Sequence, residues 1–299
     1  MKNLLKLSLL LLFVSCQSQT NKLLLNKTLI SEFSNNEIEV YDITYLSDGL
    51  KVKGFLTKPK ETGKYPCIIF NRGGNQEFGS INIQMVSNFL GEIAKKGYVV
   101  IASQYRGNGG SEGKEEFGGK DVNDITILTE VLKEIEGADN DKIGMYGWSR
   151  GGMMTYIALT KTNKVKAAVV GGALSDSFEG IIDRPSMENV YQELVPKYEK
   201  NKEKELTKRS AIKWVDKFPK DVPILMLHGN SDWRVKPEQS LKLALEFEKH
   251  RIPYRLIMFE GGNHGISEHR KEVNSQVINW FDRYLKNSEP LPNMKYHGK

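Results

Sequence analysis

The fold is decided by residues 142–153, which read Lys142-Ile143-Gly144-Met145-Tyr146-Gly147-Trp148-Ser149-Arg150-Gly151-Gly152-Met153. A short apolar strand leads into a glycine-bounded turn, and residues 153–159 continue with helix-forming side chains. The spacing Gly147-x-Ser149-x-Gly151 predicts a nucleophile elbow, in which a serine stands at the tip of a strained strand-to-helix turn. Both glycines are expected because neighbouring chain passes too close for a Cβ. The alternative is a tight turn whose serine only caps the helix.

Strands and helices alternate on both sides of this turn. Continuous apolar runs predict buried strands at residues 65–70, 98–103, 165–170, 222–227 and 254–259. Helical spacing predicts helices at residues 81–96, 121–136, 237–250 and 268–285. A hairpin is predicted for residues 37–46 and 50–57 around Ser47-Asp48-Gly49. The alternation indicates an α/β fold with a mostly parallel central sheet and helices on both faces.

One domain over residues 37–287 accounts for these elements. We expect residues 17–36 to form a tether and residues 288–299 a C-terminal tail. Residues 175–220 break the alternation, since they are rich in mixed charge and helical in propensity. We interpret this stretch as a short helical cap inserted over the sheet edge that carries the elbow. The alternative is a solvated helical excursion with no role in access.

The first sixteen residues have the pattern of an export signal. Lys2 and Lys6 precede an apolar run at residues 7–14 that is too short to span a bilayer, and Ser15-Cys16 closes it. This resembles a bacterial lipoprotein signal, so we expect cleavage before Cys16, lipidation of Cys16 and residence in the cell envelope. The alternative is cleavage by ordinary signal peptidase with Cys16 incidental. Membrane contact is expected through this anchor only.

Composition narrows the remaining function classes. The chain has 299 residues, 39% of them hydrophobic and 27% charged, as is typical of a globular protein. The formal charge of +6 is spread without a basic block, so we expect no nucleic-acid binding. Cys67 lies in an apolar run and is expected to be buried. The absence of a cysteine and histidine cluster with metal-ligand spacing predicts no metal and no other cofactor.

A serine nucleophile needs two partners. An imidazole must take the hydroxyl proton during attack, and a carboxylate must orient that imidazole. In an α/β-hydrolase fold these follow the serine in the order acid, then histidine, on loops after later strands. Asp232 stands five residues past one predicted strand and His264 five past the last, so both are assigned to the site with Ser149. His228 is interpreted as a support for the loop that carries Asp232.

An oxyanion hole is expected beside the serine. One donor is the backbone N–H of Arg150, and the other comes from the loop that includes Arg72 and Gly73. Two alternatives remain for the guanidinium of Arg72: it points at the site, or it pairs with an acidic residue on the surface.

Four blocks of this sequence resemble the catalytic domain of the prolyl oligopeptidase family of serine peptidases, over roughly residues 37–287. They are residues 105–111, 147–152, 228–232 and 262–265. The resemblance implies an α/β-hydrolase fold with Ser149, Asp232 and His264 as nucleophile, acid and base. Two features depart from the family. Arg72 stands where an aromatic residue or histidine is usual, and only some twenty residues precede the domain, where full-length peptidases carry a β-propeller. Size selection would then fall to the cap or be absent.

Three functions remain on these observations. The first is a serine hydrolase that cleaves short peptides or peptide-like amides through an acyl-enzyme. The second is a carboxylic-ester hydrolase, an esterase or deacetylase, on the same triad, because fold-level likeness leaves the scissile bond open. The third is a catalytically silent binding module, against which the intact triad and glycines argue.

Overall fold

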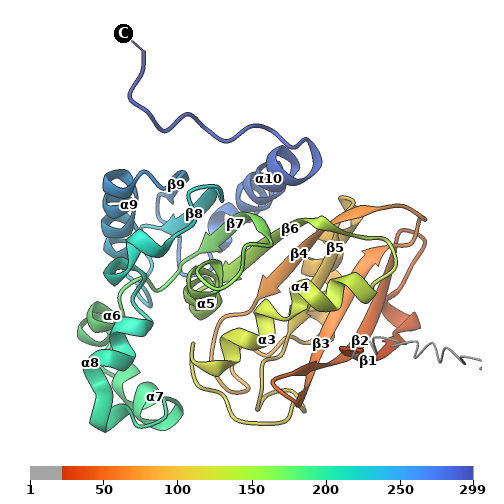
Figure 1. The fold of residues 1–299 in the computed structure, drawn as a ribbon, viewed down its shortest axis with the longest axis horizontal. Coiled ribbons are helices and arrows are strands. Elements are labelled where there is room, and N and C mark those ends of the chain that lie inside the picture. Colours follow the sequence, from red (N-terminus) through yellow and green to blue (C-terminus); the bar gives the residue numbers. More distant parts are fainter. Residues whose placement is uncertain (1–21, 299) are drawn as a thin grey trace, which may run out of the picture.

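A computed structural model describes residues 22–298, and within them one nine-stranded sheet runs in the order β1-β2-β3-β5-β4-β6-β7-β8-β9 (Figure 1). The strands are β1 Leu24–Leu29, β2 Ile38–Ser47, β3 Leu50–Pro59, β4 Tyr65–Asn71, β5 Val99–Ser103, β6 Ala138–Trp148, β7 Val165–Gly171, β8 Ile224–Gly229 and β9 Tyr254–Phe259. Strands β4 to β9 pair in parallel with one another, whereas β1, β2 and β3 form an antiparallel edge that joins them through the antiparallel β3–β5 pair. The predicted α/β fold with a mostly parallel sheet is confirmed.

Helices cover both faces of the sheet. The main segments are α1 Ile83–Met85, α2 Gly91–Lys95, α3 Asn123–Thr126, α4 Leu128–Val131, α5 Arg150–Leu159, α9 Glu238–His250 and α10 Arg270–Phe281. A π-helical turn, Val86–Leu90, joins α1 to α2, and another, Asp282–Lys286, extends α10. The apolar side chains of α1, α2 and α10 form one buried cluster, and those of α3, α4, α5 and α9 form the other. The sheet therefore separates two cores.

The first hairpin folds as its turn chemistry predicts. Asp48 and Gly49 both have positive φ, at 51° and 79°, which suits a two-residue turn between twisted antiparallel strands. The β2–β3 register is continuous from the Ser47–Leu50 pair outward. This hairpin fixes the antiparallel edge, away from the strand that leads to Ser149.

Two expectations need correction. Residues 24–29 belong to β1, which pairs with β2, and are not a tether. Only Leu24 of this edge strand is buried, so the sequence carries no alternating pattern. The helix predicted for residues 121–136 is broken: Lys120–Val122 and Leu132–Glu134 are 3-10 turns around α3 and α4. Thr126 and Thr129 each donate a hydroxyl hydrogen bond to the carbonyl three residues earlier, which competes with regular helical geometry.

Residues 175–220 form a group of short helices at one end of the molecule (Figure 1). They are α6 Ser177–Asp183, α7 Met187–Leu194, α8 Tyr198–Lys208 and the 3-10 turns Ala211–Lys213 and Val215–Lys217. The predicted export signal and Cys16 lie outside the described residues. Among residues 22–298, no helix combines the length and apolar character needed to cross a membrane.

Candidate active site

Ser149 stands at a strained turn between β6 and α5. Its φ of 57° and ψ of −121° lie in a region that side chains rarely adopt, and its backbone N–H donates to the carbonyl of Gly171 at 2.8 Å. A Cβ at Gly151 would overlap the carbonyl of Asn71, and one at Gly147 would overlap that of Gly151. The close passage predicted at both glycines is confirmed. The Ser149 hydroxyl makes no capping bond to α5, so the helix-cap alternative fails.

Asp232 is held in the loop after β8 with both carboxylate oxygens occupied. Oδ1 accepts from the backbone N–H groups of Arg234 at 2.8 Å and Val235 at 3.1 Å, and Oδ2 accepts from Nδ1 of His264 at 2.7 Å. Burial opposes ionisation, but hydrogen bonds from His228 and His264 hold the pKa of Asp232 well below its usual range. The carboxylate is therefore ionised and orients the imidazole.

His228 supports this loop as predicted. Its ring is buried, with Nε2 2.9 Å from the carbonyl oxygen of Val235 and Nδ1 2.6 Å from the Ser240 hydroxyl. A carbonyl only accepts, so Nε2 carries the proton and also points at the Asp232 carboxylate, 3.3 Å away. The imidazole thus fixes the backbone turn on which Asp232 stands.

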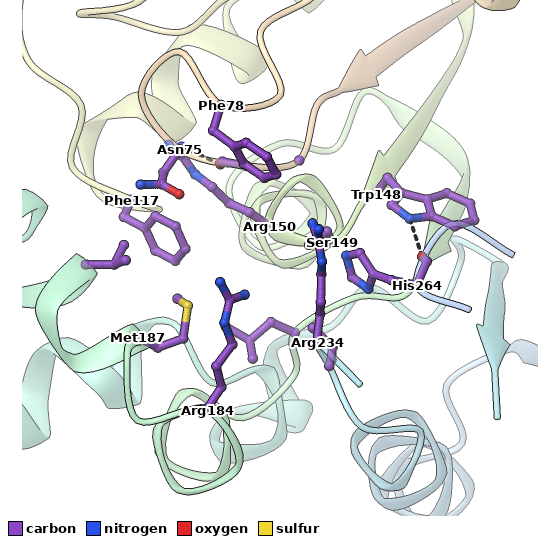
Figure 2. Close-up of a pocket in the computed structure, with 16 residues that line it drawn as sticks. Asn75, Phe78, Phe117, Trp148, Ser149, Arg150, Arg184, Met187, Arg234 and His264 are labelled. Carbon is purple, nitrogen blue, oxygen red and sulfur yellow. Dashed lines mark hydrogen bonds between the residues drawn. The ribbon is translucent and has the colours of Figure 1, made fainter. Parts of the chain in front are cut away.

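His264 faces Ser149 across the same pocket (Figure 2). Because Nδ1 donates to Asp232, Nε2 is the nitrogen left to accept a proton. Trp148, the residue before Ser149, donates from Nε1 to the His264 carbonyl at 2.9 Å. A Cβ on Gly172 would stand 3.3 Å from the His264 ring, so the end of β7 leaves room for it. Sequence reasoning missed Trp148, whose position in the elbow motif accepts any residue.

The two segments predicted to supply the oxyanion hole meet beside Ser149. Arg150 opens α5, where backbone N–H groups have no partner inside the helix. Gly73 lines the pocket, and a Cβ built on it would lie 3.2 Å from Cβ of Ser149. Arg72 is fully buried and follows neither expected reading, since its guanidinium donates to backbone carbonyls, those of Gln104 and Gln76 among them. It fixes the loop from beneath.

The Arg150 side chain forms a buried network that sequence reasoning also missed. It pairs with Glu115 and with Asp121, 2.5 Å away, and donates to the carbonyl of Gly74 at 3.0 Å. Glu115 in turn accepts from the backbone N–H of Gln76 at 2.8 Å. The network ties the elbow to the loop that carries Gly73. Glu115 lies in irregular chain and Asp121 in the 3-10 turn Lys120–Val122, where no local pattern marks a partner for Arg150.

The pocket above Ser149 has a volume of about 230 Å³. Its walls come from the Gly73 loop, the elbow, the chain around residues 234–235 and the predicted cap. Cap residues in the lining are Gly180, Arg184, Met187 and Val190. Within residues 22–298, no group of three histidine, cysteine, aspartate or glutamate side chains is placed to hold a metal ion. The arrangement suits acyl transfer by a hydroxyl, an imidazole and a carboxylate.

Comparison with known families agrees with this geometry. Residues 82–288 match the model of the prolyl oligopeptidase family. The chain belongs to the prolyl oligopeptidase family. It is a serine hydrolase with the α/β-hydrolase fold of that family. Residues 17–123 also match the model of acetyl xylan esterase.

Individual relatives differ in how much of their length they share with this family member. The uncharacterized peptidase YtmA of Bacillus subtilis (strain 168) is 28% identical over 85% of this chain and 95% of its own. Dipeptidyl-peptidase 5 of Porphyromonas gingivalis is 26% identical over 75% of this chain but 34% of its own. The acylaminoacyl peptidase structure of Pyrococcus horikoshii has a TM-score of 0.73 and 25% identity, covering 86% of this chain and 44% of that one.

An esterase shares the fold at lower identity. The acetyl xylan esterase of Paenibacillus sp. R4 has a TM-score of 0.66 and 17% identity, covering 85% of this chain and 87% of its own. At that identity the likeness extends to the fold alone.

Proposed function

We propose that this serine hydrolase is a peptidase that cleaves short peptides or peptide-like amides through an acyl-enzyme. The observation that carries the proposal is the hydrogen bond between His264 Nδ1 and the ionised Asp232, which leaves Nε2 facing the pocket that Ser149 lines. An imidazole oriented in this way can take the serine proton and return it to a leaving amine.

The steps follow from the positions of the side chains. Oγ of Ser149 attacks the scissile carbonyl carbon while Nε2 of His264 accepts the hydroxyl proton. The backbone N–H groups of Arg150 and Gly73 are the proposed donors to the oxyanion. The imidazolium then protonates the leaving nitrogen as the C–N bond breaks. Water, deprotonated by the same imidazole, then attacks the acyl carbon, and the imidazolium returns that proton to Oγ of Ser149 as the ester bond breaks and the acid leaves.

Two observations support a peptide substrate. The pocket of about 230 Å³ is small, as suits part of a short peptide, and is walled on one side by the cap. An acylaminoacyl peptidase in complex with Z-Gly-Gly-Phe-chloromethyl ketone shares the fold, with a TM-score of 0.72 and 26% identity over 86% of this chain and 43% of that one. A peptide-derived group occupies that relative, and we extend the substrate class to this chain.

A carboxylic-ester hydrolase on the same triad is the second candidate. The match of residues 17–123 to the acetyl xylan esterase model favours it, as does the nearly full-length fold likeness to an acetyl xylan esterase. An ester has a better leaving group than an amide, so the same groups would suffice for it.

Turnover of matched substrates tests these two functions. We expect cleavage of aminoacyl anilides as well as p-nitrophenyl acetate. Cleavage of p-nitrophenyl acetate and acetylated sugars with no anilide cleavage would assign the esterase function instead. A fluorophosphonate should label the wild type covalently and leave Ser149→Ala unlabelled. A folded wild type that resists labelling would contradict both functions.

We also propose that the protein is exported and lipid-anchored in a bacterial cell envelope. The support is the sequence pattern of Lys2, Lys6, the apolar run at residues 7–14 and Cys16. Expression in a bacterial host with an alkyne fatty acid should label the wild type but not Cys16→Ser. Equal labelling of the two, or no labelling of either, would sink the proposed anchor.

A further inference from the structure

Two arginine side chains reach into the catalytic pocket without a partner of opposite charge. Arg184 and Arg234 both line it, and neither makes an ion pair or a side-chain hydrogen bond within residues 22–298. No aspartate or glutamate is among the lining residues. The third arginine of the pocket, Arg150, is different because it is paired with Glu115 and Asp121. The lining of the pocket therefore presents two guanidinium groups that no carboxylate pairs with.

Aromatic rings hold these two guanidinium groups in place. Arg184 Cζ lies 5.6 Å and Arg234 Cζ 5.4 Å from the ring centroid of Trp233, and Arg234 also lies 5.5 Å from that of Phe78. Stacking on a ring orients a planar cation while leaving its N–H donors available. Asp183, the acid next to Arg184, pairs instead with Lys236 at 2.9 Å. The guanidinium groups of Arg184 and Arg234 are thus positioned to bind an acceptor group on a ligand.

The position of His264 indicates which part of the substrate meets Arg184. His264 must protonate the leaving group, so that part lies on the His264 side of Ser149. Figure 2 shows Arg184, Met187 and Phe117 on the other side of Ser149. The acyl part of the substrate therefore occupies the space beside Arg184.

We propose that the pocket selects substrates whose acyl part carries a carboxylate, bound by Arg184 together with Arg234. This rests on the proposed amide hydrolysis and names its substrate class: peptides with glutamate or aspartate at, or one residue before, the scissile bond. The guanidinium fork matches a carboxylate in shape and charge. Met187, Val190 and Phe117 provide apolar contact for the rest of the acyl group.

Four coumarinamides test the proposal with charge as the variable: N-acetyl Ala-Glu, Ala-Gln, Glu-Ala and Gln-Ala. We expect kcat/KM for glutamate to exceed that for the isosteric glutamine by about 10- to 100-fold in at least one of the two positions, the range of a charge-assisted hydrogen bond. The preference should weaken at high salt, since the pocket opens to solvent. Equal turnover of both members of each pair, or a preference for glutamine, would overturn the proposal.

Substitution of Arg184 tests whether this residue causes the preference for glutamate over glutamine. In Arg184→Gln the preference should fall to within about threefold while the glutamine substrates are still cleaved, and Arg184→Lys should keep part of it. Arg255→Gln removes an exposed arginine on β9 outside the pocket and should keep all of it. Fluorophosphonate labelling of Arg184→Gln shows that its site is folded. A labelled Arg184→Gln with the full preference would contradict the assignment.

Failure of the proposed function gives a different result. If all four amides are inert while the wild type is labelled, peptide hydrolysis fails as the function. The charge preference is then measured with p-nitrophenyl hydrogen glutarate against p-nitrophenyl pentanoate. A preference for the glutarate that Arg184→Gln loses supports the anion site, and its absence refutes it.

Discussion

At the scale of single residues, Asp232 sets the state of the base. Its Oδ2 fixes the proton on Nδ1 of His264, so replacing the carboxylate by an amide permits the wrong imidazole tautomer. We expect Asp232→Asn to lower kcat on the order of 10⁴-fold with a small change in KM. Steady-state kinetics on p-nitrophenyl acetate measures this. A loss of less than tenfold would contradict the role of Asp232.

The same residue links stability to pH. The folded pKa of Asp232 is lowered, so its contribution to the free energy of unfolding is complete above the ordinary carboxyl pKa of about 4 and is lost as pH falls toward the folded pKa. Asparagine does not titrate at this position. Urea unfolding of wild type and Asp232→Asn should therefore show their stability difference shrinking below about pH 4. A difference that is constant from pH 7 to pH 3 contradicts the lowered pKa.

Single residues also mark how far the sequence could be interpreted. Ser149, Asp232 and His264 could be located because each follows a strand with a clear apolar pattern and the chain order is fixed by the fold. The hydrogen-bond partners of Arg72 and Arg150 could not be predicted, because they come from distant loops whose sequences show no periodicity. The position of Arg184 in the pocket could not be predicted either. Arg184 directly follows α6, and whether its side chain reaches the pocket depends on how α6 is oriented in the fold.

At the scale of elements, the buried Arg150 network connects the elbow to the Gly73 loop. Glu115→Gln removes one of the two carboxylates that pair with the buried Arg150 and the charged acceptor of the Gln76 N–H, and we expect a loss of about 3 kcal/mol in the free energy of unfolding. Loosening of the Gln76 backbone should lower kcat by up to about a hundredfold. Urea unfolding and kinetics measure the two effects.

An exposed ion pair gives the matched control. Glu130 bonds Lys133 three residues later at 2.6 Å with both side chains well exposed. Glu130→Gln should change the free energy of unfolding by about 0.5 kcal/mol or less. Equal effects of Glu115→Gln and Glu130→Gln would show that the buried network contributes nothing beyond a surface pair.

Strand β1 is the element that the sequence failed to reveal. Leu24 is 6% exposed and packs into the core, whereas its neighbour Leu25 is 42% exposed. Leu24→Ala should destabilise the protein by about 2–3 kcal/mol, and Leu25→Ala should be near neutral. Thermal or urea unfolding of the two variants compares them directly. Equal stabilities would restore the tether interpretation.

At the scale of the whole molecule, Cys67 reports on global opening. It lies in the central strand β4 with no exposed surface, and burial raises the pKa of its thiol to about 12. Only the thiolate reacts, so a maleimide at pH 8 should modify Cys67 in urea but not in the native protein. Peptide mapping identifies the modified residue. Rapid native modification would mean that β4 opens locally.

The overall architecture could be predicted because the parallel strands are buried on both faces and appear as continuous apolar runs. Departures occur where the fold overrides a local pattern. Residues 121–136 have helical spacing, yet threonine hydroxyls at residues 126 and 129 break the helix into shorter turns. Edge strand β1 buries only Leu24, so its sequence does not alternate between apolar and polar residues.

The strand order has a consequence for how the molecule tolerates change. Ser149, Asp232 and His264 follow β6, β8 and β9, which lie on one half of the sheet, and β2, β3, β5 and β4 stand between β1 and β6. A disturbance that begins at the antiparallel edge must cross those four strands before it reaches the reacting atoms. Insertions, fused segments or substitutions at the β1 edge are therefore expected to leave the relative positions of Ser149, Asp232 and His264 unchanged.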